Sequence, residues 1–267
     1  MAGHVIGQYL HFKGYDVTGV ARKIHKPMNW PTLTMDITDL GELRKLIAHQ
    51  GFNVVINAVG ALIEESDTKF PHALWLNGEF PNILASWSQE LRFKLFLIST
   101  DCVFDGIRGG YQDTDVPNAI DNYGLSKRIG EVSDQLNVLT IRTSIIGQEL
   151  KNGSGLWNWF QNQQHQVFGF KRVFWSGVTT YELAKMIEIC FKDDIFGLIH
   201  LTNGIPISKF DLLTILNHQL ALNINIIPHS AKYSNKSLIP SSKLLYTVSG
   251  YGDMIAEQIE FYKHEFG

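Results

Sequence analysis

Tyr123 and Lys127 lie four residues apart in the stretch YGLSK, within a segment that is predicted to be helical. Residues with this spacing project from the same face of a helix. A tyrosine phenol has a pKa of about 10 in model peptides, and a neighbouring ammonium group stabilises the phenolate and lowers that pKa. The pair can therefore supply a general acid or base to a reacting group.

The chain contains two further tyrosine–lysine pairs with this spacing, at positions 9 and 13 and at positions 181 and 185, and most such pairs are only surface neighbours. Tyr123 differs because it follows a predicted strand with hydroxyl side chains at its carboxyl end, Ser99 and Thr100 in LFLISTDCVFDG. A hydroxyl group there can hydrogen-bond a substrate carbonyl oxygen while the tyrosine donates its proton. Thr100, Tyr123 and Lys127 thus fit one site that protonates a carbonyl oxygen.

These residues need a scaffold, and the chain alternates continuous apolar runs with amphipathic segments. That alternation is typical of a parallel sheet with helices on both faces. Strands are expected at 16–21, 53–59, 94–100, 138–147 and 197–203, and helices at 39–50, 71–91 and 123–136. Asp39 and Glu42 suggest a capping box, and Pro81 predicts a break or kink. The expected fold class is a doubly wound, Rossmann-type α/β fold with a mostly parallel sheet, whose ligand lies beyond the carboxyl ends of the strands.

The alternation of strands and helices stops after Gly147. Segment 148–175 is rich in Asn, Gln, Gly and aromatic residues, and two helical patterns follow at 208–222 and 252–266, joined by a polar loop. We expect residues 1–148 to form a dinucleotide-binding domain and residues 149–267 to form mainly a smaller substrate-binding lobe. Residues 176–203 are expected to return to the first domain.

Composition limits the classes of function. The chain has 267 residues, of which 45% are hydrophobic and 18% charged, and a net charge of −3; such a chain is a soluble globular protein. This charge gives no argument for binding nucleic acid or a membrane surface, and no apolar run could span a bilayer. Cys102 and Cys190 are too few for a disulfide framework, and the ten histidines lack metal-ligand spacing. We therefore expect a cytoplasmic protein without a metal site.

Four motifs, in this order along the chain, resemble the extended short-chain dehydrogenase/reductases: NAVG at 57–60, STDCVFDG at 99–106, YGLSK at 123–127 and IRTSIIG at 141–147. The resemblance runs from Met1 to about residue 205 and is strongest to the dTDP-4-dehydrorhamnose reductases and related enzymes of bacterial cell-surface polysaccharide synthesis. It implies an oxidoreductase that uses NADPH to reduce a 4-keto-6-deoxy nucleotide sugar. The nucleotide sugar would be its partner, and a homodimer is compatible with the family.

The resemblance implies catalytic roles for three residues. Thr100 would polarise the keto group, with Ser99 as a less favoured substitute, and Tyr123 would protonate its oxygen. Lys127 would hold the nicotinamide ribose and lower the pKa of the tyrosine.

The resemblance also implies a set of cofactor-binding residues. Arg22 follows the second strand of the fold, where an acidic residue would select NAD through the ribose 2′-hydroxyl group. A cation there suits the 2′-phosphate of NADP, so NADP is expected, with NAD as the alternative. The other implied cofactor contacts are Gly3, Asp36, Ile37, Asn57, Ala58, Gly60, Ser99 and Lys127.

On the substrate side, the implied residues are Asp101, Cys102 and Trp157. Reductases of the rhamnose type usually carry an aromatic residue at the position of Cys102, and this departure leaves the identity of the sugar open.

Several of these residues also have purely structural interpretations. Asp36 fits a polar loop, and Asn57 fits a hydrogen-bonded strand end, as well as either fits a cofactor contact. Arg22 lies in the basic run RKIHK, which also fits a solvated loop. Trp157 belongs to an aromatic-rich segment of the kind that more often forms core.

Two other functions stay open at this point. An epimerase or dehydratase acting on nucleotide sugars would use the same family motifs. A non-catalytic protein that resembles the regulatory β subunit of methionine adenosyltransferase would use the fold for binding. Retention of Thr100, Tyr123 and Lys127 favours catalysis.

The opening MAGHVIGQYLHFKGYDVTGVA reads as a helix followed by a strand, which is half of a βαβ unit without its first strand. Members of the family carry a G-x-x-G-x-x-G turn after that strand, and only Gly3 matches it. We expect Met1 to be a misassigned start or a genuine truncation. We also expect the chain to melt at a lower temperature, and to bind dinucleotide less well, than a version with the strand and turn added.

Overall fold

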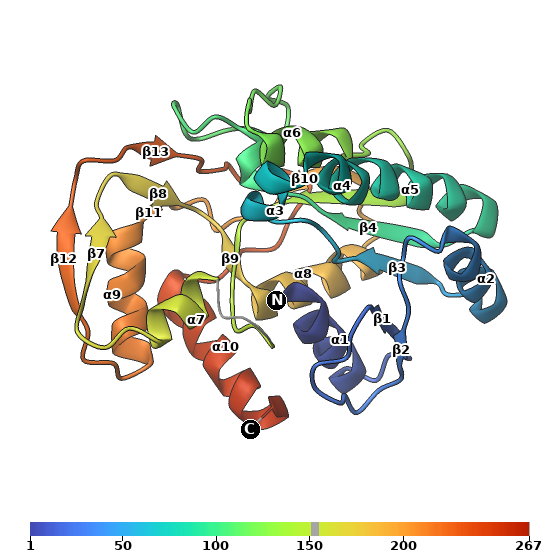
Figure 1. Ribbon diagram of the computed structural model, residues 1–267, viewed down its shortest axis with the longest axis horizontal. Coiled ribbons are helices and arrows are strands. Elements are labelled where there is room, and N and C mark those ends of the chain that lie inside the picture. The colour runs from blue at the N-terminus through green and yellow to red at the C-terminus, as the bar shows by residue number, and fades with distance from the viewer. Residues whose placement is uncertain (151–154, 267) are drawn as a thin grey trace.

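A four-stranded parallel sheet forms the centre of the molecule in the order β10-β5-β4-β3 (Figure 1). The structure is a computed structural model and describes residues 1–150 and 155–266. The strands are β3 (Val54–Asn57), β4 (Lys94–Ile98), β5 (Val138–Arg142) and β10 (Gly197–His200). All three pairings are parallel, as the continuous apolar runs predict. The expected α/β fold class with a mostly parallel sheet is confirmed.

Helices cover both faces of this sheet, and β4 shows how the sequence divides between them. Phe96 belongs to a core cluster that includes α1 (Ala2–Phe12) and α8 (Thr180–Lys192). Its neighbours Leu95 and Leu97 belong to a second cluster, with α2 (Leu40–Gln50) and α5 (Phe80–Leu91). Successive strand residues point to opposite faces, so one short apolar strand contributes to both cores.

Local signals account for the ends of α2. The Asp39 carboxylate accepts a hydrogen bond from the Glu42 amide at 3.1 Å, as the capping pattern predicts. The Glu42 side chain pairs with Lys45 instead of returning to the cap, so only half of the capping box forms. Gly51 ends the helix with φ +61°, a conformation that favours glycine.

The helical region at 63–91 differs from the prediction in one respect. It consists of α3 (Ile63–Thr68), α4 (Phe70–Leu74), a π-helical segment η1 (Trp75–Glu79) and α5. The irregularity lies before Pro81, which sits in the first turn of α5. Proline is tolerated there because the amides of the first turn lack helical partners. The helix break that the sequence predicts at Pro81 therefore occurs before that residue, in η1.

Helix α6 (Asn122–Ile129) is shorter than the predicted helix at 123–136. It ends before Gly130, whose backbone packs so closely on η1 that a Cβ atom there would clash with the carbonyl group of Asn77. Residues 131–136 form no helix, because the chain turns there toward β5. The prediction of a helix to residue 136 is therefore wrong.

The remaining elements lie mainly to one side of the central sheet (Figure 1). The predicted helices at 208–222 and 252–266 are α9 (Lys209–Gln219) and α10 (Tyr251–Phe266). The sequence did not predict the small sheets beside them. The same region contains the short helix α7 (Leu156–Gln161). The strands of the small sheets are β6 (Ile145–Ile146), β7 (Gln166–Phe170), β8 (Val173–Trp175), β9 (Val178–Thr179), β11 (Ile207–Ser208), β12 (Asn225–His229) and β13 (Ser234–Asn235).

Two short strands, β1 (Gly19–Ala21) and β2 (Thr32–Thr34), form a separate parallel pair. The indole of Trp30 packs against Gly7 of α1 and Gly19 of β1, where a Cβ atom would collide with the ring. Within the described residues, β3 pairs with β4 alone, so its other edge is open. Among these residues, no helix has the length and apolar character needed to cross a membrane.

Candidate active site

Thr100 lies directly after β4, at the start of a single 3₁₀ turn, η2 (Asp101–Val103). Its side-chain oxygen accepts a hydrogen bond from the Cys102 amide at 3.1 Å and caps the turn. The same hydroxyl group donates to the Asp101 carboxylate at 3.2 Å. Thr100 is buried, and these two contacts fix its orientation at the carboxyl end of the strand.

Helix α6 brings Tyr123 to Thr100. Asp121 caps the helix by accepting from the Gly124 amide at 2.8 Å. Gly124 lies against the carbonyl group of Cys102, where any larger side chain would clash, so α6 packs directly on η2. The Tyr123 phenol lies near enough to the Thr100 hydroxyl group for that group to lower its pKa, against the larger effect of burial. Two residues that the sequence predicts to act together thus lie close to each other.

Lys127 lies one turn further along α6 and makes a different contact from the one expected. Its Nζ donates to the carbonyl oxygen of Ile98 at 2.7 Å. Burial lowers the pKa of Lys127 to about 8, an effect that the charge of Glu131 opposes. Burial also raises the pKa of Tyr123 well above its ordinary value, with a further contribution from Cys102. The net shift in the pKa of Tyr123 is thus upward, opposite to the direction expected of Lys127, whose role stays a prediction.

Ser99 faces a buried ion pair that the sequence analysis did not identify. Its hydroxyl group donates to the Glu131 carboxylate at 2.6 Å. Arg142 binds the same carboxylate with two hydrogen bonds, at 2.8 and 2.7 Å, and both side chains are almost fully buried. Glu131 follows directly after Gly130, where the predicted helix stops, and no sequence pattern marked it. Ser99 is thus oriented by Glu131, whereas Thr100 is the hydroxyl group that acts on the pKa of Tyr123.

The expected cofactor residues at 57–60 follow β3. The Asn57 side chain accepts from the Val59 amide at 3.1 Å, and Ala58 and Gly60 are exposed. A Cβ atom on Gly60 would approach the Asn77 side chain to 2.9 Å, so the backbone there lies close to η1.

Asn77 connects this loop to the helix that carries Tyr123. Its amide group accepts from the Ala61 amide at 2.9 Å and donates to the Ala61 carbonyl at 3.1 Å. It also donates to the Ser126 hydroxyl group at 3.0 Å. Asn77 is buried and fixes the loop after β3 relative to α6, a role that the sequence did not reveal.

The first turn of α1 lies beside this loop. A Cβ atom on Gly3 would be 3.4 Å from the Cβ atom of Ala58, and both residues are exposed. The first turn of α1 contains no acidic residue, and its amides have no side-chain cap. Exposed helix N-termini of this kind bind phosphate groups. The residues present therefore fit the phosphates of a dinucleotide.

The three residues expected near the adenosine end of the cofactor fall into two groups. Arg22 and Asp36 are exposed, and Arg22 is close enough to help lower the pKa of the Asp36 carboxyl group. The larger cause of that lowered pKa is hydrogen bonding from Thr38, whose amide donates at 3.0 Å and whose hydroxyl group donates at 2.8 Å. Ile37 points into the core cluster around α2 and α5, so its side chain has a packing role.

The three residues expected to contact the substrate lie in different environments. Asp101 is buried, and burial raises the pKa of its carboxyl group. Burial raises the pKa of the Cys102 thiol to about 12, so the thiol is protonated at neutral pH. Trp157 is completely buried in the core cluster of α1 and α8. The expectation that Trp157 contacts the substrate is corrected, because core packing leaves none of its surface accessible.

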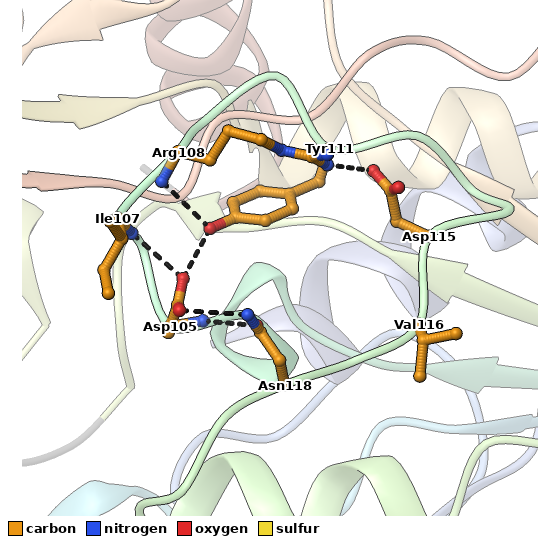
Figure 2. A pocket seen from close by; sticks show the side chains of 7 residues that line it. All are labelled: Asp105, Ile107, Arg108, Tyr111, Asp115, Val116 and Asn118. Carbon is orange, nitrogen blue, oxygen red and sulfur yellow. Dashed lines mark hydrogen bonds and ion pairs between the residues drawn. The ribbon is translucent and has the colours of Figure 1, made fainter.

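A loop at 105–118 connects η2 to the segment before α6 and lines a small open pocket of about 250 Å³ (Figure 2). The Asp105 carboxylate accepts from the Tyr111 hydroxyl group at 2.6 Å and from the Asn118 amide group at 2.9 Å. The Tyr111 ring stacks on Phe104, with centroids 4.1 Å apart. These hydrogen bonds and the ring stacking fix the loop that joins η2, which follows Thr100, to the segment before α6, which carries Tyr123.

The parallel sheet and the proximity of Tyr123 to Thr100 are the arrangement expected of the extended short-chain dehydrogenase/reductase class. Within that class, the chain belongs to the RmlD substrate binding domain family, whose model matches residues 2–238. The family expected from the four motifs is therefore confirmed.

Two curated relatives are similar in sequence. The dTDP-4-keto-6-deoxy-D-glucose reductase of Streptomyces niveus is 31% identical over 208 residues, which cover 74% of this chain and 72% of the relative. The probable low-salt glycan biosynthesis reductase Agl14 of Haloferax volcanii is 30% identical over 133 residues, covering 49% of this chain and 44% of the relative. The match to Agl14 thus spans less than half the length of that protein.

A solved structure confirms the fold. The dTDP-4-dehydrorhamnose reductase of Bacillus anthracis str. Ames, in complex with NADP, has a TM-score of 0.80 and 18% sequence identity. The match covers 97% of this chain and 95% of that chain.

Proposed function

We propose that this protein reduces the keto group of a 4-keto-6-deoxy nucleotide sugar with NADPH, in the cytoplasm, as a step in the synthesis of cell-surface polysaccharide. The observation that carries this proposal is the packing of α6 on η2 through Gly124, which brings Tyr123 close to Thr100 at the carboxyl end of β4. Both curated relatives named above are reductases, which supports the same reaction class.

Tyr123 is the proposed proton donor. Its raised pKa keeps the phenol protonated at neutral pH, which is the form that a general acid must have before the reaction. Thr100 orients the phenol and offers a second hydroxyl group to the keto oxygen. The keto carbon gains a hydride and its oxygen gains the phenolic proton, so the ketone becomes an alcohol.

A bound reduced nicotinamide dinucleotide supplies the hydride. Gly3, Ala58 and Gly60 leave backbone exposed for its phosphates, and the N-terminus of α1 favours their negative charge. Lys127 is the proposed contact for the nicotinamide ribose, and Arg22 for a 2′-phosphate. The NADP bound to the structural neighbour supports this choice of cofactor.

The two parts of the chain would divide this work. Residues 1–148 together with 176–203 contain the sheet and the proposed dinucleotide contacts. The rest of 149–267 would hold the nucleotide sugar, with Asp101 and Cys102 facing it from the sheet.

Oxidation of NADPH, followed by its absorbance, tests the proposal with a panel of dTDP- and UDP-linked 4-keto-6-deoxy sugars. We expect consumption of NADPH in the presence of at least one of these sugars and formation of the corresponding alcohol. Tight binding of NADPH and of the sugars without any consumption would reject the reductase assignment in favour of a binding function.

A further inference from the structure

Ser99, Arg142 and His200 lie at the carboxyl ends of three neighbouring strands. Ser99 directly follows β4, while Arg142 and His200 are the last residues of β5 and β10. The register pairs His200 with Arg142, and the Ser99 amide donates to the Ile141 carbonyl oxygen at 2.8 Å. Ligands of open α/β sheets bind at this edge. The three residues are therefore at the edge where the proposed cofactor binds.

A buried ion pair lies next to Ser99. The side chains of Glu131 and Arg142 are 7% and 4% exposed. Arg142 donates to both oxygens of Glu131, from Nε at 2.8 Å and from Nη2 at 2.7 Å, and its guanidinium group lies 5.2 Å from the centroid of the Phe104 ring. The Ser99 hydroxyl group lies 2.6 Å from Oε1 of the same carboxylate. Ser99 is thus the residue through which the ion pair reaches the proposed site.

The chemistry of these partners decides which atom carries the proton between Ser99 and Glu131. In the ion pair Glu131 is a carboxylate, which accepts hydrogen bonds and donates none. The Ser99 hydroxyl group must therefore be the donor. A hydroxyl group has one proton and two lone pairs, so Ser99 can only accept any further hydrogen bond. The residue is 7% exposed, which leaves a small part of it accessible beside Thr100.

His200 holds Arg142 from the side opposite Glu131. His200 is completely buried, and its Nδ1 lies 3.1 Å from the Tyr111 carbonyl oxygen, which can only accept. Nδ1 therefore carries the proton of the neutral ring, and Nε2 accepts from Nη1 of Arg142 at 3.4 Å. Burial and the charge of Arg142 lower the pKa of His200 to about 4, so the ring is neutral at pH 7. Each donor in this chain of hydrogen bonds thus has an acceptor.

The ion pair is an expensive way to fill this space. The cost of taking both charges out of water offsets much of their attraction, so apolar side chains of similar size could serve the fold as well. Apolar side chains could not orient the Ser99 hydroxyl group. An amide in place of Glu131 would also fail, because Arg142 would attract its single oxygen and its NH₂ group would then face Ser99 as a donor.

We propose that Glu131 and Arg142 are positioning residues that hold the Ser99 hydroxyl group as a hydrogen-bond acceptor for the nicotinamide half of the cofactor. The group that Ser99 accepts from is an N–H of the carboxamide or an O–H of the adjoining ribose, since these are the donors in that half of the molecule. The inference rests on the proposed function, because that function supplies the dinucleotide. It gives Ser99, expected from the sequence only as a cofactor contact, a defined direction of hydrogen bonding.

Dissociation constants of NADPH, measured by fluorescence titration without any sugar, test the proposal. Ser99→Ala removes the acceptor and should weaken binding by about 3- to 10-fold, the usual effect of one hydrogen bond. Glu131→Gln should weaken it to a similar extent. The two changes together should weaken it no more than Ser99→Ala alone, because Glu131 acts through Ser99. Ser99→Thr, which keeps the hydroxyl group, should retain most of the affinity.

Glu182→Gln is the matched control, because the Glu182 side chain is fully buried and pairs with Lys185 at 2.5 Å within α8. It should bind NADPH as the parent does, whatever its effect on the melting temperature. Unchanged affinity in Ser99→Ala, which leaves both hydrogen bonds of the ion pair in place, would overturn the proposal. Losses that multiply in the double variant would also overturn it, by showing that Glu131 affects the cofactor independently of Ser99.

The acetylpyridine analogue of NADPH, which has an acetyl group in place of the carboxamide, distinguishes the two donors. If the carboxamide donates to Ser99, parent and Ser99→Ala should bind this analogue equally. If the ribose donates, Ser99→Ala should lose the same affinity for the analogue as for NADPH. Failure of the proposed reduction alone would leave all these dissociation constants as expected and would appear as bound NADPH that no sugar oxidises.

Discussion

Tyr123 enters the proposed reaction as a neutral phenol that is half-buried near Thr100. Burial, with added effects from Cys102 and Asp101, raises its pKa, so its proton is retained across the neutral range. The residue is thereby suited to give a proton to a substrate oxygen that becomes basic as a hydride arrives. The ammonium group of Lys127, bound to the Ile98 carbonyl, is directed to the end of β4.

Tyr123→Phe should lower the rate of reduction by ~10²–10⁴-fold, because it removes the only proposed proton donor. The melting temperature and the affinity for NADPH should change little, since the ring remains. Steady-state NADPH oxidation measures the loss. Tyr181→Phe is the control, because Tyr181 belongs to another tyrosine–lysine pair with the same spacing and lies outside the site. A rate for Tyr123→Phe within a few-fold of the parent would contradict the assignment.

Arg22→Asp should weaken binding of NADPH and improve the relative binding of NADH. The change removes an exposed cation from the proposed 2′-phosphate contact and adds a charge that repels phosphate. Fluorescence titration of both cofactors measures the preference. Lys23→Asp, at the exposed neighbouring position, controls for the general change in charge. If both variants shift the preference equally, Arg22 has no specific role.

The sequence predicted that Thr100 and Tyr123 lie close together, because both residues belong to local motifs next to recognisable elements. It could not predict the buried ion pair between Glu131 and Arg142, which joins side chains from separate elements. It also misassigned Trp157, because an aromatic side chain packs equally well in a core or against a ligand. Spacing along the chain reveals contacts within one element, whereas contacts between elements depend on the fold.

At the level of elements, η1 connects the loop after β3, which contains proposed cofactor contacts, to α6, which carries Tyr123. Its Asn77 side chain binds both the loop after β3 and the Ser126 hydroxyl group on α6. The close packing of Gly130 on the Asn77 carbonyl group adds a backbone contact between the same elements. Displacing η1 would therefore move Tyr123 relative to the exposed loop at 57–60.

Asn77→Ala should destabilise the protein by about 1–3 kcal/mol, because it leaves buried groups of Ala61 without their hydrogen-bond partners. It should also lower kcat, since Tyr123 and the loop after β3 lose their fixed relation. Urea unfolding and steady-state kinetics measure the two effects. Asn217→Ala removes a similar side-chain link, to Ile224 near the end of α9, and should affect stability without lowering kcat. A parent-like kcat in Asn77→Ala would refute the positioning role.

Elements with strong local signals were predicted well. The central strands follow continuous apolar runs, and α2 has both its N-cap and its terminal glycine in the sequence. The end of α6 was missed because Gly130 is set by packing on η1, which no local pattern records. The short strands β7 to β9 and β11 to β13 were missed because two to five residues carry too little periodicity, whereas β6 falls within the strand expected at 138–147.

At the scale of the whole molecule, buried histidines link stability to pH. Burial lowers the pKa of His200 to about 4 and that of His4 to about 3. Both groups titrate near 6.5 in an unfolded chain. At pH values between the folded and unfolded pKa, the unfolded state binds more protons than the folded state. The stability that the neutral, buried histidines provide is therefore complete above pH 6.5 and is lost as the pH falls toward 4.

The free energy of unfolding should therefore fall between pH 7 and pH 5, by about 1.4 kcal/mol per histidine for each unit below 6.5. His200→Gln should show a shallower dependence on pH. His49→Gln, at an exposed position on α2, should behave as the parent does. Urea titrations at several pH values provide the measurement. A free energy of unfolding that stays constant from pH 7 to pH 5 would be incompatible with neutral, buried histidines.

Transfer of deuterium from NADPH labelled at C4 of the nicotinamide to the sugar tests the central claim most directly. The protein would be incubated with labelled NADPH and the active 4-keto-6-deoxy nucleotide sugar, and the product examined by NMR. We expect one deuterium atom at C4 of the sugar for each NADPH oxidised, and almost none with Tyr123→Phe. A product that lacks deuterium at C4, or one formed without oxidation of NADPH, would contradict the reduction proposed here.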